Sequence, residues 1–242
     1  MTTVAIHQPG YFPWLGLIDK IARADLFIVL DTVQFNRAAY QHRTLYSTAA
    51  GAKLLTLPVR HAGFLQSGLP IREVELANLR MPAKHFETLR GRYRKAPGWG
   101  ALEEGLRELL LVPAERLMEL SLASMRMTLQ ALGVERPMVL ASELGCDGTK
   151  TDLVIELVKA VGADTYLSGT GARAYQINEE FEKAGIRLLY QNFSHPEWQQ
   201  SQPGAFLPGC FALEWALETG EGAAAAFRQY LDRTATSGVT AC

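Results

Sequence analysis

The fold is decided by residues 4–31, which read VAIHQPGYFPWLGLIDKIARADLFIVLD. This stretch begins with a short β-prone run at 4–6 and ends with the apolar run 26–30, which stops at Asp31. Apolar runs without alternation are typical of strands covered on both faces, as in parallel sheets. Residues 15–24 carry apolar side chains at helical spacing, with polar ones at 19, 20 and 23. The stretch therefore predicts a β-α-β unit.

The segments that follow extend this pattern after an interruption. Residues 54–59 predict an edge strand, and 63–68 a loop. Helices are predicted at 82–95, 102–111 and 113–132, because Pro82 and Pro113 suit first turns and Gly133 suits a helix end. Strands at 138–141, 165–168 and 186–190 then alternate with helices at 152–161 and about 175–184. A final helical region, 213–231, is split by two glycines.

These elements predict an α/β fold: a largely parallel, Rossmann-like sheet flanked by helices, with a helical insert. The N-terminal part of the α/β domain would span residues 1–81 and the insert residues 82–133. The C-terminal part of the same domain would span 134–233, and 234–242 would form a frayed tail.

Composition excludes several function classes. The 242 residues are 48% hydrophobic with a formal charge of −1, so no global field favours nucleic acid or a membrane. The chain has no signal peptide pattern and no apolar run of the ~18 residues that a span needs. Its three cysteines are widely spaced, which fits a reducing cytoplasm. We expect no cofactor and no metal, although a metal site assembled from distant residues stays open.

The first candidate site lies in the loop after the first strand. Parallel sheets bind ligands beyond the carboxyl ends of their strands, where His7 and Gln8 would lie. Tyr11 and Trp14 add flat faces with polar tips. The alternative is a turn in which Trp14 belongs to the core and His7 binds backbone groups.

The second candidate site follows the next strand, where Asp31 would act as a base or hydroxyl acceptor. The alternative for Asp31 is a cap for the next turn. Gln34 and His42 follow it, and Arg43 is a better anion-binding candidate than Arg37, although exposed arginines are common.

Two later loops carry further candidates. Ser168, Gly169 and the glycine at 171 follow a strand, where backbone N–H groups can approach an anion, although such a motif is also a simple tight turn. The loop 190–200 is polar and aromatic or else a plain surface loop, and contributes Tyr190, His195, Trp198 and Gln200. The basic run 84–95 fits a solvated helix face better than an RNA or acidic carrier protein surface.

Eight separated blocks resemble the WbqC-like family in order and spacing, from Val4 to about Gly220. They read HQPGYFPWLG, DLFIVLDTVQF, QHR, LTLPV, KHFETLRGRYRKAPGW, KTDLVIELVKAVGADTYLSGTGARAY, FEKAGI, and HPEWQQ with FLP. The family is named after a protein associated with bacterial O-antigen gene clusters, and other members resemble companions of specialised-metabolite pathways. The resemblance implies site roles for His7 or Gln8, Pro9, Tyr11, Pro13, Trp14, Gly16, Asp31, Gln34, Arg43, Ser168, Gly169, Tyr175, Pro196 and Gln200.

The chain departs from the family pattern at three places. It has His42 before Arg43 where the family has asparagine, and Trp198 where tyrosine is usual. The stretch 209–214, GCFALE, loses a serine and exchanges the carboxylate. The substrate is therefore expected to differ from that of the O-antigen members, with His42 as the distinguishing residue.

Together these features predict a biosynthetic enzyme that acts on an amine-bearing small molecule, such as an amino acid derivative or an amino sugar. Asp31, His7 and His42 would be catalytic, and Arg43 would stabilise an anionic leaving group. One version, implied by pathway resemblance, is intramolecular amination as in azinomycin-type aziridine formation by sulfate elimination. Asp31→Asn and Arg43→Ala are each expected to remove activity while changing the melting temperature by only a few degrees.

Three alternatives stay open. The first is N-acylation of an amino sugar on a nucleotide sugar. The second is a non-catalytic subunit that binds a small partner protein or an acidic carrier protein. The third is nucleotidyl transfer, for which the second histidine of an HxGH motif is missing.

Overall fold

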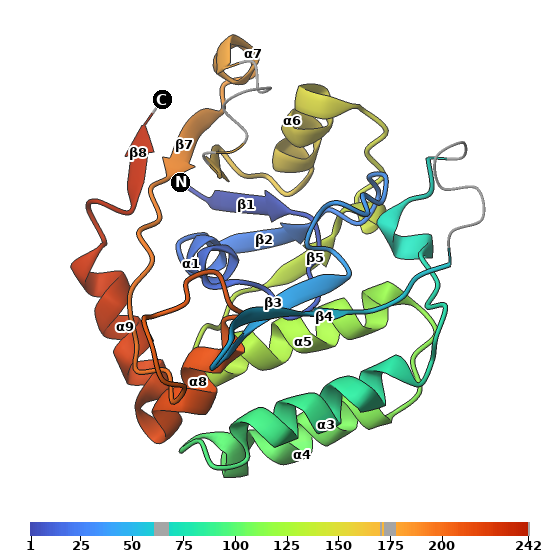
Figure 1. The fold of residues 1–242 in the computed structure, drawn as a ribbon. Helices are drawn as coiled ribbons and strands as arrows, with labels where there is room; N and C mark the ends of the chain where they lie inside the picture. Colours follow the sequence, from blue (N-terminus) through green and yellow to red (C-terminus); the bar gives the residue numbers. More distant parts are fainter. Residues whose placement is uncertain (61–67, 170, 172–177, 242) are drawn as a thin grey trace.

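The chain forms an α/β structure around one central sheet, as a computed structural model shows (Figure 1). The structure describes residues 1–60, 68–169, 171 and 178–241. Within these residues no helix is both long enough and apolar enough to cross a membrane.

The sheet has six strands in the order β5-β2-β1-β6-β7-β8. All neighbours pair in parallel except β7 and β8, which are antiparallel. The predicted fold class is therefore confirmed. The strands are β1 (Thr3–His7), β2 (Leu26–Val29), β5 (Met138–Leu140), β6 (Thr165–Ser168), β7 (Arg187–Gln191) and β8 (Val239–Ala241).

Helices cover both faces of the sheet, as the apolar strands predicted. On one face α6 (Lys150–Ala160) and α7 (Asn178–Lys183) pack on Val4, Ile28 and Tyr166. On the other, α1 (Leu15–Ala22) packs on Ala5, Phe27 and other strand residues. Figure 1 shows these two layers on opposite sides of β1 and β2. The inner strands β1, β2 and β6 thus bury consecutive side chains, on both faces of the sheet.

The chain between β2 and β5 contains more than the helical insert predicted at 82–133. It contains a hairpin of β3 (Arg43–Thr48) and β4 (Gly51–Thr56), then the short helix η1 (Ile71–Glu73). Three long helices follow and confirm the helical prediction, with boundaries shifted by a few residues. They are α3 (Met81–Tyr93), α4 (Trp99–Leu111) and α5 (Leu117–Ala131).

The hairpin differs from the sequence prediction, which placed one strand at 54–59 and none before it. The reason is that β3 buries polar side chains. Thr44 and Ser47 point inward, and their hydroxyls donate to Phe12 O and to the carboxylate of Glu214. A strand whose buried residues are polar shows no apolar alternation, so its period is hidden.

The C-terminal region confirms one prediction and corrects another. A helical pair, α8 (Leu213–Thr219) and α9 (Ala223–Arg233), is split by η4 (Gly220–Gly222) as predicted. The tail is not frayed throughout, however, because Val239–Ala241 form β8 and pair with β7. Arg23 donates to Thr234, and Asn192 donates to Ser237 O and Gly238 O, so distant residues hold the tail in place.

Candidate functional site

The strand order places a topological switch point between β1 and β6. From β1 the chain proceeds to β2 and β5 on one side, whereas β6 and β7 continue on the other. Loops that leave such neighbouring strands in opposite directions open a crevice at the carboxyl ends, where open α/β sheets bind ligands. His7 ends β1 and Ser168 ends β6. The sequence had singled out both residues.

The loop after β1 is held rigidly by polar contacts. Phe12 is buried and has a positive φ of 45°, a conformation that side chains other than glycine rarely adopt. Ser124 Oγ accepts from Phe12 N at 2.9 Å, and Thr44 Oγ1 donates to Phe12 O at 2.8 Å. Backbone strain held by surrounding contacts is a recurrent feature of binding sites.

Trp14 lies over the start of α1. Its ring packs edge-on against Phe193, with centroids 5.3 Å apart, and 42% of the residue stays exposed. A Cβ atom at Gly16 would come within 2.1 Å of the indole, so glycine is required for this ring position. Trp14 is therefore a wall of the crevice, and the alternative of a fully buried core tryptophan does not describe it.

Two adjoining cavities meet at His7, Trp14 and Leu17, which line both. The first, here called the aromatic cavity, has a volume of about 500 Å³. Exposed Trp14 and Tyr40 flank it together with apolar groups of the first loop and β3. Its other lining residues are Gln8, Pro9, Gly10, Phe12, Pro13, Ala39, Gln41, Arg43, Thr44, Leu45 and Gly209.

The second, here called the lysine cavity, has a volume of about 470 Å³ and lies between β1 and β6. Ser168, Gly169 and Gly171 line it from the β6 side, as predicted for an anion-binding turn. A Cβ at either glycine would meet nothing within 4 Å, so the backbone there is open to the cavity. The remaining lining residues are Ile6, Gly16, Lys20, Tyr166, Gln191, Asn192 and Phe193.

His7 is exposed at the junction of the two cavities. Its Nδ1–H donates to Gln8 O at 2.8 Å, because a carbonyl can only accept. In the neutral imidazole, Nε2 therefore carries a lone pair and can accept a proton or a hydrogen bond. Desolvation by the surrounding protein lowers the pKa of His7, and the Lys20 ammonium lowers it further, to about 3, so the ring is neutral at pH 7.

Lys20 is the functional candidate that the sequence reading missed. Helical spacing placed Asp19 and Lys20 on the polar face of α1, which usually meets solvent. In the fold, all eight residues of α1 are buried, and Lys20 is only 3% exposed. Burial lowers the pKa of Lys20 to about 7. The spacing of residues within α1 does not predict this burial, because residues distant in sequence cover the polar face of the helix.

Arg43 and Gln8, two of the residues singled out from the sequence, lie on the wall of the aromatic cavity. Arg43 donates to Ala38 O and its guanidinium stacks 5.3 Å from the Tyr40 ring centroid. Its Nε is buried without a partner among the described residues. Gln8 accepts from Gln41 Nε2 at 2.7 Å, and Gln41 also accepts from Asn36 N. Hydrogen bonds between two loops thus hold the polar side chains on this wall of the cavity in place.

Asp31 is buried, and Ser142 occupies both of its carboxylate oxygens. Ser142 N donates to Oδ1 at 3.0 Å, and Ser142 Oγ donates to Oδ2 at 2.7 Å. Ser142 belongs to the short helix η2 (Ala141–Glu143), which follows β5. Asp31 therefore ties the end of β2 to the end of β5 through a residue distant in sequence. Its catalytic role stays a prediction.

His42 and Tyr11 point into the protein interior. His42 is buried and packs edge-on against Phe35, whereas its neighbours Gln41 and Arg43 line the aromatic cavity. Tyr11 is fully buried, and its hydroxyl bonds to His85 Nδ1 at 2.9 Å. Burial raises the pKa of Tyr11. Their predicted contacts with a substrate stay predictions.

The loop 190–200 packs on the C-terminal helices. Tyr190 donates to Asn178 on the α7 face of the sheet, and the His195 ring packs beside Trp198. Trp198 stacks on Trp215, with centroids 5.4 Å apart. Gln200 donates to Glu214 at 2.9 Å. His195, Trp198 and Gln200 therefore lie in a polar and aromatic layer, whereas Tyr190 lies on the α7 face of the sheet. None of the four is among the lining residues of the two cavities.

Glu214, where the chain departs from the family pattern, is the centre of that layer. It is fully buried and accepts from Ser47, Tyr93 and Gln200. Burial raises the pKa of Glu214, although its donors and Arg92 oppose the shift. Arg92 pairs with Glu218 at 2.9 Å. The basic run 84–95 is therefore not a continuous patch, because His85 and Arg92 are bound inside.

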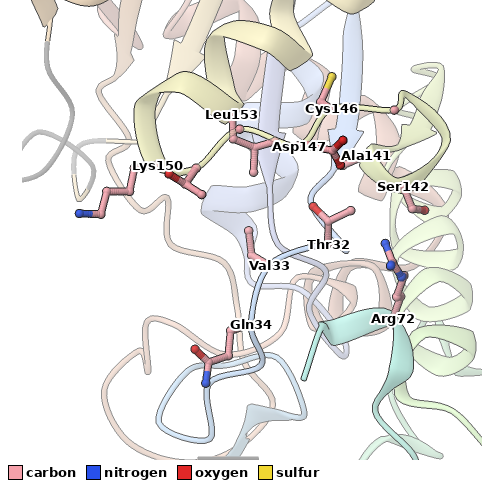
Figure 2. A pocket seen from close by; sticks show the side chains of 13 residues that line it. Thr32, Val33, Gln34, Arg72, Ala141, Ser142, Cys146, Asp147, Lys150 and Leu153 are labelled. Atoms are coloured by element: carbon pink, nitrogen blue, oxygen red, sulfur yellow. The ribbon is translucent and has the colours of Figure 1, made fainter. Parts of the chain in front are cut away.

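A third cavity of about 560 Å³ lies beyond β2 and β5 (Figure 2). Gln34 and Thr32 line it, with Arg72, Ser142 and Asp147 from three other segments. Figure 2 shows Lys150 extending away from the other labelled side chains. Gln34 is thus separated from the crevice at His7. Tyr175, also predicted, lies outside the described residues.

Metal-binding groups do not gather within the described ranges. Among residues 1–60, 68–169, 171 and 178–241, no three His, Cys, Asp or Glu side chains are close enough to share a metal ion.

Comparison with known proteins identifies the family. The chain is similar to the uncharacterized protein Rv1507c of Mycobacterium tuberculosis (strain ATCC 25618 / H37Rv), with 26% identity over 223 residues. The alignment covers 91% of this chain and 95% of that protein. No solved structure matches the chain. The model of the WbqC-like protein family matches residues 8–224, which include the polar layer at Glu214 and the lining residues of both cavities except Ile6 and His7. The chain belongs to the WbqC-like protein family.

Proposed function

We propose that the protein is a biosynthetic enzyme that binds an amine-bearing small molecule in the two adjoining cavities and uses His7 as its base. The observation that carries the proposal is the position of His7. A neutral imidazole, fixed by its Nδ1–H bond to Gln8 O, is exposed where two cavities meet at a topological switch point. Positioned imidazoles of this kind transfer protons in many enzymes.

The chemistry that suits this geometry is attack by the substrate nitrogen. As the nitrogen forms a bond to carbon, its N–H proton becomes acidic, and even a weak base such as His7 Nε2 can then accept it. If the attacked carbon carries an anionic leaving group, that bond breaks and the group leaves with the electron pair. Arg43, whose Nε is free of protein partners in the described chain, supports stabilisation of that anion.

The aromatic cavity supports recognition of a ring or another flat group. Trp14 and Tyr40 are 42% and 55% exposed on its wall, which is unusual for such large apolar groups. Their exposed faces suit a sugar ring or an aromatic substituent. An amino sugar or an amino acid derivative with a bulky substituent would fill both cavities. The odd number and wide spacing of the cysteines support a cytoplasmic location.

The test compares wild type, His7→Asn and Arg43→Ala on an amine-containing metabolite extract, read by mass spectrometry. Asparagine keeps an N–H donor near the Nδ1 position but lacks the base at Nε2. We expect wild type to consume one compound and to release its leaving group, and His7→Asn to be slower by roughly 10²-fold or more.

Arg94→Ala is the matched control for Arg43→Ala, because Arg94 is exposed at the end of α3 and lines neither cavity. It should react at the wild-type rate. Consumption of no compound by wild type, or equal rates for wild type and His7→Asn, would contradict the proposed function.

A further inference from the structure

Lys20 is a buried cation that the described part of the protein does not neutralise. Its Nζ donates to Ile6 O at 2.9 Å, which uses one of its three protons. No carboxylate among the described residues lies within 4.0 Å of this ammonium. Such a group is costly to bury, so an unpaired buried lysine beside a cavity indicates that something else supplies the counter-charge.

The neighbouring carboxylate is already paired. Asp19 binds Arg23 at 2.8 Å and accepts from Gln191 Nε2 at 2.6 Å. The other titratable groups facing Lys20 are His7 from β1 and Tyr166 from β6, which both line the same cavity. Neither carries a negative charge at pH 7. Among the described groups that face it, Lys20 therefore has no counter-charge.

The cavity itself has the chemistry of an anion site. None of its described lining residues is an aspartate or glutamate. Gly169 and Gly171 leave the backbone open on the side of β6, and the Lys20 amine, when protonated, provides a positive charge on the side of β1. A compact anion would meet a cation and an accessible backbone, and no acidic side chain among the described lining residues would repel it.

We propose that Lys20 binds an anionic group of the ligand, a carboxylate, a phosphate or a sulfate, in the lysine cavity. This inference names the recognised group at the proposed active site and so rests on the proposed function for its biological meaning. Together the two place the amine of the substrate at His7 and a permanent anionic group at Lys20. The ligand would then supply the counter-charge that the fold leaves out.

The experiment measures anion binding to the resting protein, by thermal shift and calorimetry, with sulfate, inorganic phosphate and acetate. Chloride keeps the ionic strength constant. At pH 6.5 we expect at least one of the three anions to bind wild type saturably, and Lys20→Met to bind it at least tenfold more weakly. Lys53→Met, which changes an exposed lysine on β4, should bind like wild type. The three anions distinguish the three candidate groups.

A second readout needs no variant. Because the amine must be protonated to pair with an anion, the affinity of wild type should fall about tenfold per pH unit above pH 7. No saturable anion binding by wild type, equal binding by Lys20→Met, or a pH-independent affinity would overturn the inference. These outcomes are independent of turnover, so failure of the inference and failure of the proposed function are distinguishable.

Discussion

Asp31 and Lys20 are two buried charged side chains near the carboxyl ends of neighbouring strands, and their surroundings differ. Asp31 is 1% exposed and receives two hydrogen bonds from Ser142. Lys20 is 3% exposed and makes one bond, to a backbone carbonyl. The protein thus completes the contacts of the carboxylate and leaves those of the ammonium incomplete.

This difference separates structural from binding roles. A buried ionic group whose partners all belong to the protein holds elements together, and its loss is a loss of stability. A buried ionic group without such partners lowers stability in the free protein and gains its partner from a ligand. Sequence reasoning weighted the two residues the other way, since it made Asp31 catalytic and left Lys20 on a helix face.

The largest stability effect is expected for Asp31→Ala. It leaves two donors of Ser142 without an acceptor and separates the ends of β2 and β5, at a cost of about 3 kcal/mol in the free energy of unfolding. Urea denaturation of wild type, Asp31→Ala, Ser142→Ala and the double variant measures the coupling. The expectation from sequence for Asp31→Asn, a nearly unchanged melting temperature, stays a prediction, because asparagine keeps one acceptor oxygen for Ser142. If the effects of the two single changes were additive, Asp31 and Ser142 would not be coupled, and the contrast between Asp31 and Lys20 would not hold.

A change of opposite sign is expected for Lys20→Met. Burial lowers the pKa of Lys20 to about 7, so between pH 7 and about 10.5 the unfolded state binds the proton more strongly and stability rises with pH. The penalty is full below pH 7. Lys20→Met should therefore be about 2 kcal/mol more stable than wild type at pH 6, with the gain disappearing towards pH 10.5.

Chemical denaturation at pH 6, 8 and 10 checks this sign, with Lys53→Met as the exposed control. A variant that is less stable than wild type at pH 6 would mean that the Lys20 ammonium has a stabilising partner in the free protein. Lys20 would then resemble Asp31, and the contrast between the two residues would not hold.

The smallest stability effect is expected for Gly16→Ala. Alanine favours the helix by up to about 1 kcal/mol, but its Cβ displaces the partly exposed Trp14 ring, so the net change should stay within about 1 kcal/mol. Ligand affinity should nevertheless fall, since Trp14 lines both cavities. Thermal unfolding and binding of the compound found by mass spectrometry measure the two effects separately. Unchanged affinity would remove Trp14 from the recognised surface.

Much of the fold follows from local sequence. The β-α-β opening, the later alternation and the three insert helices appear where apolar spacing predicted them, because both faces of a parallel sheet must be apolar. The hairpin strand β3 was hidden because Thr44 and Ser47 are its buried residues. The edge strand β8 was hidden because Arg23 and Asn192, far away in sequence, hold the tail.

For the candidate site, the sequence indicated the location, at the carboxyl ends of the strands. Only the tertiary structure decided which residues line the two cavities. The carboxyl ends of strands were correctly expected to gather polar groups, and His7, Gln8, Trp14, Arg43, Ser168 and Gly169 do line the two cavities. Whether a polar residue there faces a cavity or a protein partner depends on contacts between distant segments. Ser142 donates a hydrogen bond to Asp31, and Phe35 packs against His42. No described carboxylate pairs with Lys20, because Asp19 pairs with Arg23. These contacts depend on packing, which the local periodicity of the sequence does not encode.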